Sequence, residues 1–202
     1  MNENIYLMMN KPKGYVCKTV SDWNTPVYTL LPPEYLAITE PCKLHTIGRL
    51  DLDTEGLLLF TNDGKLSHNL TIPTNHIDKT YYVELEKGVS ATDQQNFIEK
   101  CKTGFLIPPE KKGPEFFCKP STLEWISPSS CNLTISEGKF HQVKRMLNAL
   151  GNTVIYLKRI KMGPVELDKN LKPGEFRPLT KIELDSLINT IYNVSINNNK
   201  RQ

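Results

Sequence analysis

The chain has 202 residues, of which 39% are hydrophobic and 23% charged, and its formal net charge at pH 7 is +3. This composition is typical of a soluble globular protein, and no apolar run is long enough to span a membrane. The first residues lack the layout of a secretion signal. Five scattered cysteines without a Cys-x-x-Cys pair indicate reduced thiols in a cytoplasm rather than disulfides or zinc.

The first half of the chain predicts short strands separated by loops. Apolar runs and turn signals place strands at 5–9, 15–17 and 57–61. A loop with one helical turn is expected over 21–45, and a short helix over 65–70.

The second half predicts a strand over 79–86, where Tyr81 shares one face with Val83 and Leu85. Capping residues predict helices that begin after Ser90 and after Thr180. The remaining expected elements are an exposed loop at 105–120, strands at 123–126, 132–135 and 154–157, and a helix at 140–150.

Strands and helices alternate without regular βαβ spacing, so we predict an α+β fold with a mixed, mostly antiparallel central sheet. The length suits one domain of two subdomains, which we place at 1–192. The tail at 193–202 is rich in asparagine, and we predict that it is disordered.

The basic residues are unevenly distributed. The stretch from Gly138 to Val165 contains no acidic residue, and Lys11, Lys13 and Lys18 form a second basic group near the start. A short charge run is usually a solvated surface. An acid-free region of this length favours a polyanion such as nucleic acid, and it includes Lys139, Lys144, Arg145, Lys158, Arg159 and Lys161.

Asp51 lies beside Arg49 and just before the apolar run 57–60, so a rigid element is expected to hold its carboxylate. The spacing of Asp51, Asp53 and Glu55 resembles half of a calcium loop, but the twelfth position is Asn62 and the run is apolar. We therefore predict no metal. A glycosidase-like carboxylate pair remains a weaker alternative, because neighbouring positions rarely give opposed carboxylates.

Lys144 lies one helical turn from both Phe140 and Leu147 and so borders the apolar stripe of the 140–150 helix. Such a lysine usually extends to water. If it is drawn into the edge of the core it needs a carboxylate partner, and we choose Asp51. Arg145 and His141 share the more polar face and are expected to point towards a phosphate backbone.

Tyr81 has two readings. Its position with Val83 and Leu85 suits a residue that fills core. It also suits a ring at the edge of a cleft, on which a base stacks at about 1–3 kcal/mol per base.

Five motifs occur here in the order found in one family, and together the chain resembles the RsuA-type pseudouridine synthases, which isomerise uridine in ribosomal RNA. The motifs are Asn10-Lys11-Pro12-x-Gly14, Gly48-Arg49-Leu50-Asp51 with the following 54–64 segment, Lys79-Thr80-Tyr81, the 133–146 block, and the 171–180 segment. The Ser136–Met146 block is most similar to the small-subunit (16S) enzymes of the family.

The resemblance implies that Asp51 is the catalytic aspartate and that Tyr81 stacks on the extruded uracil. Lys144 would keep Asp51 ionised, and the reaction would need neither cofactor nor metal. We expect the remaining contacts to the substrate from Lys11, Arg49, His141, Gln142 and Arg145.

Members of this family commonly begin with an S4-type RNA-binding domain, whereas here the catalytic region starts almost at Met1. We expect a cytoplasmic, monomeric enzyme acting on small-subunit ribosomal RNA or on an assembling ribosomal subunit, away from membranes. The alternatives are a large-subunit (23S) pseudouridine synthase of the same family and a non-catalytic ribosomal RNA-binding assembly protein.

Overall fold

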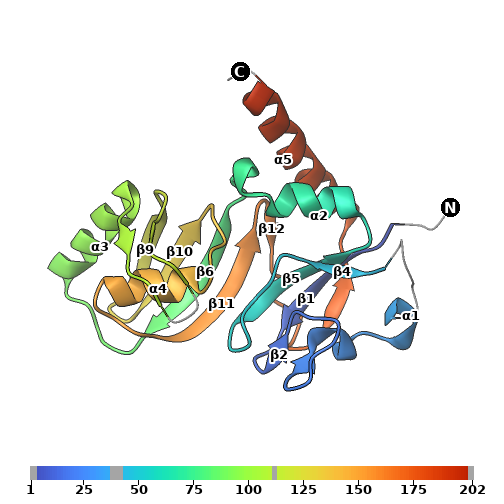
Figure 1. Cartoon of the computed structure of the whole chain (residues 1–202), viewed down its shortest axis with the longest axis horizontal. Coiled ribbons are helices and arrows are strands. Elements are labelled where there is room, and N and C mark those ends of the chain that lie inside the picture. The colour runs from blue at the N-terminus through green and yellow to red at the C-terminus, as the bar shows by residue number, and fades with distance from the viewer. Residues whose placement is uncertain (1–3, 37–42, 111–112, 200–202) are drawn as a thin grey trace. The chain divides into compact units, whose positions relative to one another are not determined.

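The structure, a computed structural model, describes residues 4–36, 43–110 and 113–199. The chain divides into two compact units, the first formed by 1–77 and 159–202 and the second by 78–158 (Figure 1). Strand β11 (Val154–Met162) runs through the division, with residues 154–158 in the second unit and 159–162 in the first.

The first unit contains strands in the order β13-β1-β5-β11, with β4 paired to β5 and β12 to β11. β1 lies antiparallel between β5 and β13, with Met8 opposite Leu59 on one side and Arg177 on the other. The bounds of these strands are β1 (Tyr6–Lys11), β4 (His45–Ile47), β5 (Glu55–Thr61), β12 (Val165–Glu166) and β13 (Phe176–Pro178).

Strand β5 is apolar along its length rather than alternating, and its residues from Gly56 to Thr61 are all buried. Such a run is expected where a sheet is covered on both faces. Leu57 and Leu59 pack in a cluster with Leu66 of α2 (Gly64–Thr71) and Leu187 of α5 (Lys181–Asn199). Phe60 meets Tyr28 edge-on, with the ring centroids 5.6 Å apart.

The rest of the first unit consists of short elements. Figure 1 shows α2 and α5 on one side of the unit's strands and β2 and α1 on the other. The sequence predicts the 21–45 region as loop with one helical turn, and the described part contains two short helices; residues 37–42 lie outside the described ranges. The short elements are β2 (Tyr15–Val16), β3 (Thr25–Pro26), η1 (Val27–Leu30), α1 (Pro33–Leu36) and η2 (Pro73–Asn75).

Helix α5 corrects the predicted disordered tail. The helix continues to Asn199, so the predicted disorder from residue 193 is wrong over the described part of the tail. The reason is that Ile191 and Val194 maintain the apolar helical spacing and pack against the core cluster of the first unit. The asparagine-rich composition therefore does not prevent helix formation.

The start of α5 has the predicted capping residues. Thr180 donates its backbone N–H to Glu183 Oε2 at 2.7 Å, and Glu183 N–H donates to Thr180 Oγ1 at 3.2 Å. Arg177 Nη1 and Nη2 donate to the two oxygens of the same carboxylate, each at 2.8 Å, and its Nε donates to Asp168 Oδ2 at 2.7 Å. The Arg177 hydrogen bonds lower the pKa of Glu183 from 4.5 to about 2.

We expect Glu183→Gln to lower the unfolding free energy at pH 7 by about 1–2 kcal/mol, because the variant loses the charge-assisted hydrogen bonds with Arg177. The effect is no larger because solvent screens charges at the surface. The pKa of Glu183 is lowered in the folded protein, so its stabilisation is fully present above the unfolded value of 4.5 and is lost as pH falls towards about 2. Urea titrations of both proteins between these pH values measure this. Glu34→Gln, at an exposed position, is the control. A constant difference across the acid range would contradict the assignment.

The second unit contains strands in the order β11-β6-β10-β9. In β6 (Lys79–Leu85), Tyr81, Val83 and Leu85 are buried while their neighbours are partly exposed, which confirms the predicted alternation. β10 (Ser130–Ile135) pairs antiparallel with β6 and with β9 (Thr122–Ser127). Helix α3 (Ala91–Thr103) packs on β9 and begins at Ser90, whose Oγ accepts from Asp93 N at 3.2 Å.

The segment 105–120 is more ordered than predicted. It contains a small hairpin, in which β7 (Leu106–Ile107) pairs with β8 (Phe116–Phe117).

Helix α4 (Gln142–Ala149) lies within the predicted 140–150 range. Among the described residues, no helix has both the length and the apolar character needed to cross a membrane.

Candidate active site

Asp51 lies in a tight turn of the first unit, between β4 and β5. Gly48 has a φ of +69°, in the region that favours glycine, and this reverses the chain after Ile47. The Leu50 side chain is 6% exposed and anchors the turn in the core, while Arg49 before it is exposed. Thr54 N–H donates to Asp51 O at 3.1 Å, which closes the turn at the start of β5.

Lys11 holds this turn from inside. Its side chain is fully buried, and Nζ donates to the carbonyl oxygens of Pro12, Asp51 and Thr54 at 3.1, 3.0 and 2.8 Å. An ammonium has three donors, and each has an acceptor here. The contact of Lys11 with substrate stays a prediction, and the side chain itself positions the backbone of Asp51. The reason is that Lys11 ends a strand buried on both faces, so its stem points inward.

The segment 14–17 adds three contacts to the same turn. Gly14 N–H donates to Leu52 O at 2.8 Å. The Cys17 sulfur accepts from Leu50 N–H at 3.4 Å and donates to Leu50 O at 3.5 Å. The backbone of residues 50–52 is therefore held at every residue by side chains or backbone of 11–17. Sequence reasoning missed Cys17, because a lone cysteine with no spacing signal predicts only a reduced thiol.

Burial shifts the pKa values of two groups under this turn. Burial lowers the pKa of Lys11, and nearby Cys17, Asp51 and Asp53 partly oppose that shift. Burial raises the pKa of the Cys17 thiol, against the lowering effect of its bond to Leu50 and of Lys11. A protonated thiol is the form that can donate to the Leu50 carbonyl.

The second unit carries the predicted residues of helix α4. His141, just before the helix, has a φ of +50°, and its ring stacks on Phe140 with centroids 3.7 Å apart. Its Nδ1 lies 3.6 Å from Glu110 Oε2, and the His141 side chain is 32% exposed. His141 therefore remains accessible to an RNA phosphate, and its binding role stays a prediction.

Arg145 corrects the expectation that it points towards a phosphate backbone. It is 6% exposed, and Nη2 donates to the carbonyls of Pro108 and Pro114 at 2.7 and 2.6 Å. Its guanidinium carbon lies 4.8 Å from the centre of the Phe116 ring. Proline has no N–H group, so backbone carbonyls in a proline-rich loop need hydrogen-bond donors from elsewhere. Arg145 supplies these donors to Pro108 and Pro114, between β7 and β8.

Gln142 is also buried, at 4% exposure, and its contact with substrate stays a prediction. Its Nε2 donates to Glu137 Oε2 at 2.9 Å, and its Oε1 accepts from Lys139 N at 3.0 Å. These bonds tie the start of α4 to the loop before it. Gln142 is a positioning residue for the loop before α4.

Lys144 and Tyr81 belong to the second unit as well. Lys144 is half-buried on α4, as the stripe-edge position predicts, and Tyr81 is 9% exposed with its Cα opposite Leu133 of β10. The first unit brings Asp51, Arg49 and Lys11 together; the second brings together His141, Gln142, Lys144 and Arg145. The pairing of Asp51 with Lys144 and the approach of Tyr81 to Asp51 stay predictions.

Within the described ranges, no three side chains among histidine, cysteine, aspartate and glutamate gather as metal ligands would. Glu55 to Thr61, which a calcium loop would use for ligands, form β5 instead.

Comparisons with known proteins identify the family. A sequence profile described as RNA pseudouridylate synthase matches residues 5–149. The protein named ribosomal small subunit pseudouridine synthase A from Salmonella typhimurium is 46% identical over 182 residues, which are 90% of this chain and 73% of the relative. The protein of the same name from Haemophilus influenzae is 43% identical over 188 residues, covering 93% of this chain and 75% of its own.

The solved structures agree. One described as a crystal structure of pseudouridylate synthase superposes with a TM-score of 0.78 at 43% identity, over 93% of this chain and 75% of its own. A chain of a Cbf5–Nop10–Gar1 complex has a TM-score of 0.58 at 16% identity, over 84% of this chain and 52% of its own, and supports the fold alone. The predicted α+β fold with a mixed central sheet is confirmed. The chain belongs to the RNA pseudouridylate synthase family.

Proposed function

We propose that this protein isomerises a uridine of small-subunit ribosomal RNA to pseudouridine, with Asp51 as the catalytic group. The relatives cited above carry the name of a small-subunit pseudouridine synthase, and they match 90% or more of the chain. The family supports RNA as the partner, and so do the exposed side chains of Lys13, Lys18 and Lys139. We place the enzyme in the cytoplasm as a monomer, acting on free ribosomal RNA or on an assembling subunit.

The reaction breaks the C1′–N1 bond of uridine and forms a C1′–C5 bond, while the proton leaves C5 and N1 gains one. Atoms and electrons balance without an oxidant, a reductant or a cofactor. A stacked and paired uridine hides its glycosidic bond, so the nucleotide must first leave the helix. A carboxylate such as Asp51 serves as the nucleophile or base while the glycosidic bond is broken.

The fixed backbone of Asp51 is the observation that best supports this role. A catalytic group must hold its geometry within a fraction of an ångström, and groups on rigid elements do so best. The Asp51 carbonyl accepts from both Lys11 and Thr54, and the residues on either side are held by Cys17 and Gly14. A solvated turn of a binding protein would not need a fully buried ammonium beneath it.

Tyr81 and Lys144 have supporting roles in the proposal. The Tyr81 ring stacks on the extruded uracil and assists removal of the C5 proton. Lys144 pairs with Asp51 and favours its ionised form, since an opposite charge nearby stabilises a carboxylate. Arg49, which is exposed next to Asp51, contacts a phosphate of the extruded nucleotide.

The proposal is tested with small-subunit and large-subunit ribosomal RNA transcripts labelled with tritium at C5 of uridine, each free and in partly assembled particles. Tritium released to water counts the C5–C1′ bonds formed. We expect release from small-subunit RNA at one uridine. Release from large-subunit RNA alone would overturn the subunit assignment, and tight binding without any release would identify a binding protein instead.

A further inference from the structure

The loop between β2 and β3 carries an unusually exposed tryptophan. Trp23 is 91% exposed and Val20, in the same loop, is 78% exposed. Tryptophan is among the most buried residue types on average, so a ring left almost wholly in water is the exception that needs a reason. Neither side chain belongs to the core cluster of the first unit or to the Asp51 turn.

The loop has a defined shape that presents this ring. β2 and β3 pair in parallel, with Tyr15 opposite Thr25 and Val16 opposite Pro26. Asn24 N–H donates to Ser21 Oγ at 3.2 Å and closes a turn around Trp23. Lys13 lies two positions before Tyr15 of β2, and Trp23 lies two positions before Thr25 of β3, so both precede the ends of the two strands that pair.

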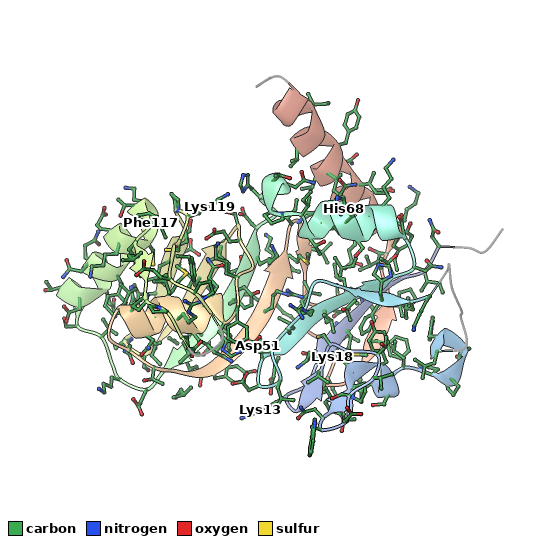
Figure 2. All side chains as sticks on the ribbon, viewed as in Figure 1. Lys13, Lys18, Asp51, His68, Phe117 and Lys119 are labelled. Atoms are coloured by element: carbon green, nitrogen blue, oxygen red, sulfur yellow. The ribbon has the colours of Figure 1, made fainter. Side chains whose placement is uncertain are left out.

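This loop lies close to the Asp51 turn, within the first unit. Gly14, next to Lys13, donates to Leu52 O at 2.8 Å, and Cys17, next to Lys18, bonds to Leu50. Figure 2 shows Lys13 and Lys18 on the same side of the first unit as Asp51, whereas His68 of α2 lies on the other side. A strand of RNA that presents a uridine to Asp51 would therefore pass this loop.

The charges favour RNA over a protein as the occupant. Lys13 and Lys18 are both exposed, and Asp22 is the one acid between Lys13 and Thr25. An aromatic ring flanked by lysines is the arrangement that binds single-stranded nucleic acid, with the ring under a base and the ammonium groups on phosphates.

We propose that Trp23, Lys13 and Lys18 form a second RNA contact outside the site of the extruded uridine. Trp23 stacks on an unpaired base of the RNA that flanks the target, and the two lysines neutralise adjacent phosphates. This inference rests on the proposed function for its choice of RNA. The contact increases the affinity for RNA and positions the strand but takes no part in the reaction. Trp23 is therefore a binding residue, not a catalytic one.

Trp23 fluorescence tests the contact directly. The chain has two tryptophans, and Trp125 is packed against Phe97 and donates to Gln94 O at 3.2 Å, so Trp125→Phe leaves Trp23 as the only reporter. A short RNA containing the target uridine is titrated in, with anisotropy of labelled RNA as an independent measure of binding. Quenching of Trp23 and its protection from acrylamide should follow the binding curve. Unchanged Trp23 emission at saturating RNA would overturn the proposal.

Affinity measurements with matched variants complete the test. Trp23→Ala should raise Kd about 10-fold, and Trp23→Phe should restore most of it, because a phenyl ring also stacks. Lys13→Ala with Lys18→Ala should lower the slope of log Kd against log salt by about 2. Ile182→Ala, at a residue 79% exposed on α5, should change neither quantity.

The two proposals fail in different ways. If the parent protein forms no pseudouridine in any RNA, the proposed function fails, while quenching and Kd still report on Trp23. If the parent forms pseudouridine and Trp23→Ala binds RNA as the parent does, this inference fails alone. Circular dichroism of Trp23→Ala, expected to match that of the parent, separates lost contact from lost fold.

Discussion

An Asp51→Asn variant is expected to bind ribosomal RNA with the affinity of the parent. Its rate of pseudouridine formation is expected to be lower by a factor of about 10⁴ or more. The amide has nearly the shape of the carboxylate but is a poor nucleophile and no base at neutral pH. Tritium release under single-turnover conditions, with RNA binding followed by filter retention, measures both quantities.

The fold around Asp51 should survive this change. The backbone carbonyl of Asp51 accepts from Lys11 and Thr54, so those bonds remain in the variant. Asp53→Asn is the matched control, because Asp53 lies two positions away, is exposed, and loses the same charge. We expect its activity to stay within a few-fold of the parent. Full activity in Asp51→Asn, or equal losses in both variants, would refute a catalytic role for Asp51.

Lys11→Met is expected to reduce both stability and turnover, with the unfolding free energy at pH 7 lowered by about 3 kcal/mol. Methionine preserves the apolar stem but leaves the carbonyls of Pro12 and Thr54 without the donors they have in the parent. The turn carrying Asp51 would loosen, and turnover should fall more than the affinity for RNA. Urea denaturation and single-turnover kinetics, compared with Lys65→Met at an exposed lysine of α2, measure this.

The pH dependence of this pair of proteins gives a second check. Burial lowers the pKa of Lys11 below its ordinary 10.5, so between the two values the unfolded chain binds more protons than the folded one. Stability of the parent relative to Lys11→Met should therefore rise as pH approaches 10.5. A decrease in this stability difference over that alkaline range would mean that the folded protein stabilises the Lys11 ammonium more than its burial implies.

The elements with strong local signals were predictable from sequence. The apolar run of β5, the alternation of β6 and the capping residues Thr180 and Glu183 each follow from short-range physical rules that the rest of the chain does not override. The short strand β13 was not predicted, because its partner β1 lies at the other end of the chain. The β7–β8 hairpin was not predicted, because its strands have only two residues each and lie in a segment rich in proline, glycine and lysine.

The candidate site was predictable in part. The half-buried position of Lys144 on its helix was predicted correctly, whereas the catalytic role of Asp51 stays a prediction. Three predicted substrate contacts, Lys11, Gln142 and Arg145, proved to be buried. A sequence shows that a side chain is charged or polar but not whether its polar group is exposed to solvent. A cation can be buried where the carbonyl groups of a tight turn accept all of its hydrogen bonds.

Formation of pseudouridine in small-subunit ribosomal RNA through Asp51 can be tested in cells. Pseudouridine is mapped chemically in ribosomal RNA from cells that lack the protein, complemented with the parent, Asp53→Asn or Asp51→Asn. We expect that one small-subunit uridine loses its modification, regains it with the parent and Asp53→Asn, and stays unmodified with Asp51→Asn. Restoration by Asp51→Asn, or no change in small-subunit RNA on loss of the protein, would contradict this expectation.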